Sequence, residues 1–199
     1  MELNEAVHGR RMVRAFTGAP VDRAVLDRLC DLARRAPSAG HSQGIDLVVL
    51  EGPEAVGRYW DVTLPQPRRA GFRWPGLVVA PSLVLVVVDP GAYVARYAEP
   101  DKAATGLGSG PGAWPVPYWW VDAGAAVEHL LLGAVDEELG ACLFGLFGHE
   151  EAVAVAFGIP ADRRIAGAIA IGHPAPDEPG RSASRPRRSL DEVVHRGRW

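Results

Sequence analysis

One long apolar stretch, residues 119–139, constrains the fold of this chain more than any other feature. An apolar stripe repeats at helical spacing through Val127, Leu130, Leu131, Ala134, Val135 and Leu139. Further apolar residues widen this stripe: Val121, Ala123, Ala125, Ala126 and Leu132. A helix that is apolar on most sides is buried on most sides, either inside a domain or across a subunit interface. We expect Asp122 to cap its start, while Gly140 follows its end.

The other helices and strands are predicted from the spacing of apolar residues and from the prolines and glycines that interrupt it. Residues 21–36 form an amphipathic pattern typical of a helix that ends at Pro37. Strands are expected at residues 45–51, 83–89 and 165–172, and helices at residues 53–60 and 150–157. The run 141–148, which is apolar and punctuated by glycines, is either a core strand with a bulge or a backbone lying against a flat ligand.

Residues 61–118 are expected to be loops around one strand, because nine prolines and several glycines interrupt them. The glycines at 106–112 do not follow a strand into a helix, so a nucleotide-binding loop is disfavoured. A lid or crossover and a disordered loop both remain open. The aromatic residues Trp114, Tyr118, Trp119 and Trp120 form either a wall for a planar substrate or part of the core or of a dimer interface.

Composition excludes several classes of protein. A net charge of -3 over 199 residues argues against a nucleic-acid-binding protein. Cys30 and Cys142 are far apart and form no CxxC motif, so we expect no metal site and a reduced, cytoplasmic protein. The longest apolar run, residues 77–88, contains Pro81 and is too short to cross a membrane, and the N-terminus has no signal-peptide pattern. His129 is expected to be a structural histidine.

Arginines cluster at both ends of the chain. Arg10, Arg11 and Arg14 precede the first predicted helix. A second cluster contains Arg181, Arg185, Arg187, Arg188, Arg196 and Arg198. Because a guanidinium binds phosphate with two parallel hydrogen bonds, two such clusters could close on one phosphorylated ligand. The alternative is that arginine simply replaces lysine, since the chain has a single lysine, Lys102.

No hydrolytic, metal-binding or Walker motif is present, which favours a cofactor that carries the chemistry. The order of several short motifs resembles the FMN-dependent nitroreductase family. These motifs are Arg10-Arg11-x-x-Arg14-x-Phe16, then Ala36-Pro37-Ser38-Ala39-Gly40-x-x-Gln43, then the apolar helix, Gly158-Ile159-Pro160, Ile171-Gly172-His173-Pro174 and the segment 185–195. Met12, His41, Gly44 and Ile45 differ from residues that are usual in that family.

The resemblance implies an α+β fold with a central mixed or antiparallel sheet, flanked by helices, in an intertwined homodimer. It implies one FMN-binding domain, residues 1–199, with a loop-rich insertion at about 61–118 and a C-terminal arm at about 174–199. It also implies the residues that bind FMN. Those at the phosphate are Arg10, Arg11, Arg14, Arg185 and Arg187, and those at the ring and ribityl chain are Pro37, Ser38, Ala39, Gln43, Leu146, Phe147 and Gly148.

The implied reaction is transfer of a hydride from NAD(P)H, through FMN, to a nitroaromatic, quinone or similar small conjugated acceptor, with no catalytic side chain. Because the ring-side residues differ, two alternatives stay open. One is a flavin-dependent dehydrogenase or oxidase of a peptide-like or heterocyclic substrate. The other is a flavin-binding protein without turnover.

Overall fold

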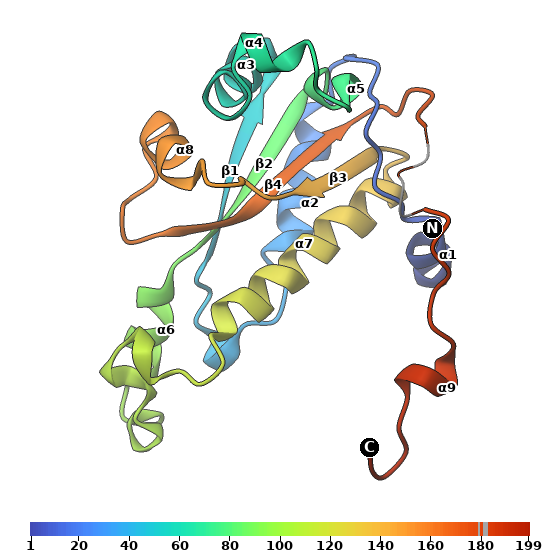
Figure 1. The fold of residues 1–199 in the computed structure, drawn as a ribbon. Coiled ribbons are helices and arrows are strands. Elements are labelled where there is room, and N and C mark those ends of the chain that lie inside the picture. The colour runs from blue at the N-terminus through green and yellow to red at the C-terminus, as the bar shows by residue number, and fades with distance from the viewer. Residues whose placement is uncertain (179, 181–182) are drawn as a thin grey trace.

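A four-stranded antiparallel sheet lies at the centre of the computed structural model, which describes residues 1–178, 180 and 183–199 (Figure 1). The strand order is β1-β2-β4-β3. The strands are β1 Ile45–Glu51, β2 Ser82–Val88, β3 Gly140–Phe144 and β4 Arg164–Gly172. The α+β fold with a central sheet is thus confirmed, and all pairings are antiparallel. Arg181, part of the C-terminal arginine cluster, lies outside the described residues.

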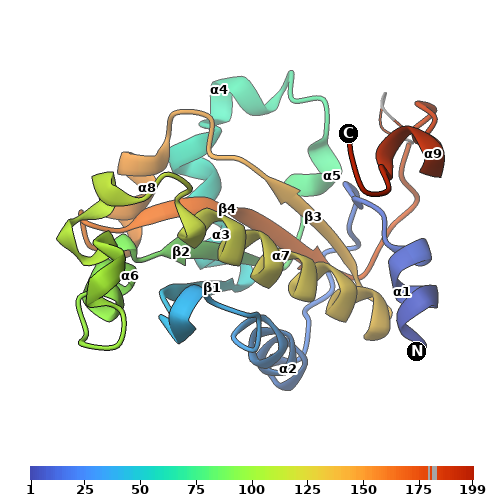
Figure 2. The same ribbon diagram turned by 90° about the horizontal axis from the view of Figure 1, so that it is seen from below.

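Helices cover both faces of the sheet (Figure 2). Alternate residues of β2 point to opposite faces because the side-chain period of a strand is two. Val84, Val86 and Val88 pack with α2 Arg23–Ala33 and α7 Tyr118–Asp136. Leu83, Leu85 and Val87 pack with α3 Gly52–Thr63 and α8 Glu150–Phe157. All seven residues of β2 are therefore buried, which explains its continuous apolar sequence.

The long helix α7 begins at Tyr118, one turn before Asp122, and ends at Asp136. The prediction that Asp122 caps this helix is therefore wrong. Pro117 occupies the capping position, and Trp119 of the first turn is buried in the core, so the helix extends past the expected cap. Nine of the 19 residues of α7 are buried, Ala126, Leu130 and Ala134 fully, whereas Val121 remains 54% exposed, so within this chain one face of the helix stays accessible.

Five α-helices in the described part of the chain were not predicted: α1 Leu3–Gly9, α4 Gln66–Arg69, α5 Pro75–Val78, α6 Pro90–Tyr97 and α9 Leu190–Val193. In α6, Asp89 caps the first turn by accepting a hydrogen bond from the backbone N–H of Ala92, and Pro90 occupies the start of the helix. A proline interrupts most structures but is favourable at the first helical position. Three short 3-10 turns occupy this region, Ala103–Thr105, Leu107–Ser109 and Pro111–Ala113, with Gly106 and Gly110 between them and Gly108 and Gly112 inside the second and third.

The segment 12–17 holds the two ends of the chain together. The backbone N–H of Val13 donates to the carbonyl oxygen of Ala141 in β3 at 2.9 Å. The N–H of Ala175, beyond the end of β4, donates to the carbonyl of Ala15, also at 2.9 Å. Gly140 permits this approach, because a Cβ there would lie 2.8 Å from a methyl group of Val13. The C-terminal arm consequently leaves the sheet and passes beside α1 (Figure 1). None of the described helices is long and apolar enough to cross a membrane.

Candidate functional site

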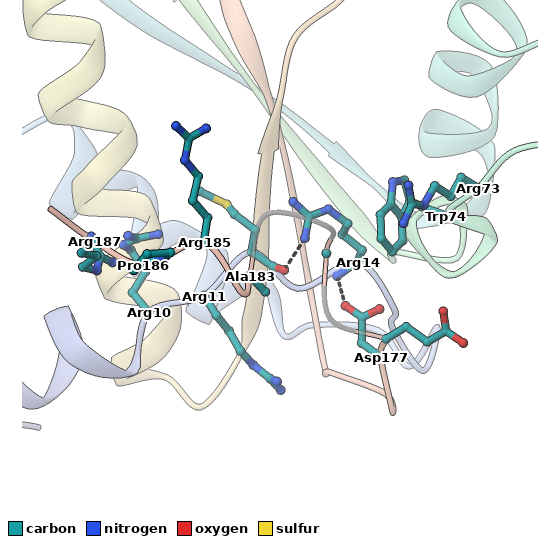
Figure 3. A pocket seen from close by; sticks show the side chains of 13 residues that line it. Arg10, Arg11, Arg14, Arg73, Trp74, Asp177, Ala183, Arg185, Pro186 and Arg187 are labelled. Carbon is teal, nitrogen blue, oxygen red and sulfur yellow. Dashed lines mark hydrogen bonds between the residues drawn. The ribbon is translucent and has the colours of Figure 1, made fainter.

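A basic cleft of about 790 Å³ lies where the two ends of the chain meet (Figure 3). Its lining includes all five arginines of the predicted phosphate site: Arg10, Arg11, Arg14, Arg185 and Arg187. Arg73, Trp74, Asp177 and Glu178 also line it. The structure therefore brings together arginines that lie more than 170 residues apart in the sequence. Their role in binding a phosphate stays a prediction.

Arg14 is held at the centre of this cleft by three contacts. Its backbone N–H donates to a carboxylate oxygen of Asp177 at 2.7 Å. Its guanidinium donates to the carbonyl oxygen of Met12 at 3.1 Å and lies 5.1 Å from the centre of the Trp74 ring. Arg73 lies 4.7 Å from the centre of the same ring. The Trp74 ring restrains the guanidinium groups of both Arg14 and Arg73, and donors held in this way favour a fixed ligand geometry.

The charge of the cleft suits an anion. Among the described residues, six arginines and two carboxylates line the cleft, and the Asp177 carboxylate is hydrogen-bonded to the Arg14 backbone. Arg10 forms an ion pair with Glu128 of α7, with 3.2 Å between Nε and the carboxylate oxygen. The remaining guanidinium donors match the acceptor oxygens of a phosphate. Sequence patterns gave no signal for Arg73 and Trp74, which stand before Pro75 in the segment treated as loops.

An apolar cavity of about 400 Å³ adjoins the basic cleft and shares Arg14 and Trp74 with it. Aromatic side chains dominate its lining: Tyr59, Trp60, Phe72, Trp74, Phe144 and Phe147. The rings of Trp60 and Phe144 are stacked, with centres 5.6 Å apart and planes 16° apart. Burial raises the pKa of Cys142, which also lines this cavity, and this favours the protonated thiol.

The predicted ring-side residues after β3 border this cavity. Leu146 and Phe147 line it, and Gly148 lines the neighbouring cavity of about 690 Å³ together with both of them. Leu146 is buried, whereas Phe147 is 87% exposed and has a φ of 49°. A bulky residue rarely adopts this left-handed conformation, which is often found at functional sites.

The predicted loop, residues 37–43, lies elsewhere. Pro37, Ser38, Ala39 and Gln43 line neither the basic cleft nor the apolar cavity among the residues described. The N–H of Ala39 instead donates to Asp122 in the second turn of α7, whereas α1 lies beside the other end of that helix (Figure 1). Arg10 of the basic cleft follows α1 directly. The residues predicted to bind one cofactor therefore fall into two groups within a single chain.

The four aromatic residues considered as a substrate wall also fall into two groups, one in the core and one at the surface. Trp114 and Trp119 are buried and pack edge-on against Tyr93, with ring centres 6.0 and 5.9 Å away. These two belong to the core. Tyr118 and Trp120 are partly exposed, and Arg164 lies 5.6 Å from the ring centre of Trp120. His129 lies within hydrogen-bonding distance of the Leu32 carbonyl oxygen, 2.9 Å, as expected for a structural histidine.

Known proteins resemble this chain in sequence and in fold. The model of a family described as the nitroreductase family matches residues 7–173. A 4-nitrobenzoate reductase of a Nocardioides strain is 27% identical, over 94% of this chain and 87% of its own length. The structure of the FMN- and NADPH-dependent nitroreductase NfnB from a Sphingopyxis strain superposes with a TM-score of 0.71 at 22% identity, over 98% of both chains. Nitroreductase A from Vibrio parahaemolyticus superposes with a TM-score of 0.72 at 20% identity, over 100% of this chain and 78% of its own.

Proposed function

The chain belongs to the nitroreductase family, and on this premise we propose that it is an FMN-dependent oxidoreductase. In the proposed reaction NAD(P)H is the hydride donor, and a nitroaromatic, quinone or similar conjugated molecule is the acceptor. The 4-nitrobenzoate reductase and the FMN- and NADPH-dependent nitroreductase to which the chain is similar support this reaction.

The observation that carries the proposal is the junction of the basic cleft with the apolar aromatic cavity at Arg14 and Trp74. FMN has the same two parts, a phosphate at one end and a flat three-ring system at the other. The arginines of the cleft would bind the phosphate, and Leu146 and Phe147 would lie beside the ring. FMN, when bound, supplies the hydride chemistry, and the protein supplies orientation and exclusion of water.

The proposal includes a homodimer in which residues 37–43 of the second copy complete the site. Two features support it. The face of α7 that remains exposed or partly exposed is mostly apolar: Val121 and Gly124 are exposed, and Ala125, Glu128 and Leu132, which follow at helical spacing, are partly exposed. The arm beyond residue 189 carries exposed apolar side chains, of which Trp199 is 99% exposed. An extended arm of this kind suits a second copy of the chain better than water. A cytoplasmic location remains a prediction from the sequence.

The test is an anaerobic absorbance spectrum of the protein loaded with FMN, recorded before and after addition of NADPH and then NADH. We expect a flavin spectrum that bleaches with at least one nucleotide and returns when 4-nitrobenzoate or a quinone is added. Bound flavin that neither nucleotide reduces would contradict the reductase and favour a dehydrogenase or a protein without turnover. Failure to bind FMN at all would refute the proposed function.

A further inference from the structure

We infer that Asp122 is a positioning residue that fixes the 37–43 loop in the conformation needed to meet the flavin ring. The inference rests on the proposed function, in which this loop contributes to the FMN site of a second copy. Asp122 was predicted to cap α7, but it lies in the second turn of that helix. Its carboxylate therefore does not cap the helix and can bind other groups.

The contacts of Asp122 join three separate segments. One carboxylate oxygen accepts hydrogen bonds from the backbone N–H of Ala39 at 2.9 Å and from the hydroxyl of Tyr93 at 2.8 Å. Tyr93 belongs to α6 and is fully buried, and Asp122 is only 6% exposed. A carboxylate is rarely buried to this extent unless it is hydrogen-bonded, because its desolvation is costly. Burial and the neighbouring Asp122 raise the pKa of Tyr93, so its hydroxyl remains protonated and donates.

Helix α6 and its N-cap Asp89 hold the rest of the loop and the residue that follows it. Arg96 of α6 donates from Nε to the carbonyl oxygen of Gly40 at 2.9 Å. The carbonyl oxygen of Gly44 accepts from the backbone N–H of Asp89 at 2.8 Å. Gly44 lies against the Tyr93 ring so closely that a Cβ would be 2.5 Å from a ring carbon. Tyr93 is thus fixed by the loop on one side and by Asp122 on the other.

The loop needs such support because its backbone is strained. His41 has a φ of 59° and Gln43 a φ of 51°, both in the left-handed region that side chains disfavour. Strained conformations persist only where the surrounding structure imposes them, and they gather at binding sites. The Asp122 bond acts on the peptide directly before this strained stretch. Removing it leaves a partly buried N–H and a buried hydroxyl without this acceptor, and the loop can then relax away from the binding conformation.

The experiment compares Asp122→Ala, Asp122→Asn and Tyr93→Phe with the control Val84→Ala. Val84 is fully buried in the same core as Tyr93, but a valine side chain has no hydrogen-bonding group, so its variant reports the effect of lost packing without loss of a hydrogen bond. Two quantities are measured below the melting temperature of every variant. The first is the dissociation constant of FMN, from the quenching of flavin fluorescence. The second is amide hydrogen exchange of residues 38–44 in the protein without flavin, by mass spectrometry.

We expect Asp122→Ala to raise the FMN dissociation constant by at least about tenfold and to speed exchange across residues 38–44. Asp122→Asn keeps an acceptor oxygen and should stay within about threefold of wild type, with Tyr93→Phe between the two. Val84→Ala should lower the melting temperature and leave both quantities unchanged.

Three results would overturn the inference: wild-type affinity and exchange in Asp122→Ala, an equal loss of affinity in Val84→Ala, or an equal loss in Asp122→Asn. The last result would assign the effect to charge instead of to an acceptor. If the wild-type protein itself does not bind FMN, the proposed function fails. Amide exchange at Ala39 then still decides whether Asp122 fixes the loop.

Discussion

Replacement of Arg14 by alanine should weaken FMN binding about 10- to 150-fold. The guanidinium of Arg14 lies where the basic cleft meets the apolar cavity, and it is the only arginine that lines both in the described part of the chain. A hydrogen bond to a charged group contributes about 1.5–3 kcal/mol, and 1.4 kcal/mol corresponds to a factor of ten in the dissociation constant. The loss of stacking on Trp74 costs about 0.5–1 kcal/mol and affects the stability of the fold.

The assay compares two ligands in two proteins. FMN and riboflavin differ only in the phosphate, so the ratio of their dissociation constants reports contacts to that group. If Arg14 binds the phosphate, Arg14→Ala weakens the binding of FMN and leaves that of riboflavin nearly unchanged, and added salt weakens FMN binding less in the variant than in wild type. Arg28→Ala is the matched control, because Arg28 is paired with Glu137 on the surface at 2.7 Å and lines neither cavity.

Two outcomes would refute the reasoning. Unchanged FMN affinity in Arg14→Ala would remove Arg14 from the site. An equal loss for FMN and riboflavin would place Arg14 beside the ring or ribityl chain, and the phosphate site would have to be built from the other arginines of the cleft.

Three further predictions concern the fold. Gly44→Ala should destabilise the protein by about 1–3 kcal/mol in urea unfolding, because the added Cβ would lie 2.5 Å from the Tyr93 ring. An unchanged unfolding midpoint would show that the helix carrying Tyr93 shifts to make room for it. Leu130→Ala, at a fully buried position of α7, should cost about 2–5 kcal/mol in the same assay, and a loss below 1 kcal/mol would contradict the described core. Hydrogen bonds from Arg164 hold the pKa of Glu150 below its ordinary value of 4.5, so its contribution to stability is complete above that pH and is lost as pH falls through the lowered pKa. Glu150→Gln should therefore be less stable than wild type at pH 7 and nearly equal to it in strong acid, and parallel acid-unfolding curves would refute this assignment.

The sequence by itself determined the elements whose pattern is local. Continuous apolar runs predicted the strands, since β2 and β4 are buried on both faces, and the widened stripe of residues 119–139 predicted a helix buried on most sides. Apolar residues that recur every two positions in a strand, or every 3.6 positions in a helix, are those that face the core. The need to bury them is the strongest constraint on the local sequence. The helix α6 was missed because a proline can either interrupt a helix or begin one. The sequence does not distinguish the two cases at Pro90, whereas the tertiary structure does.

The tertiary structure alone decided the site. Hydrogen bonds of the segment 12–17 to β3 and to the chain after β4 bring the terminal arginines into one cleft, and no local repeat records contacts across such separations. Three other features likewise depend on strand order and helix packing. They are the presence of Arg73 and Trp74 in that cleft, the separation of the 37–43 loop from it, and the hydrogen bonds of Asp122 to that loop and to Tyr93. The order of motifs indicated which residues share a function, but only the fold showed that one chain holds them in two places.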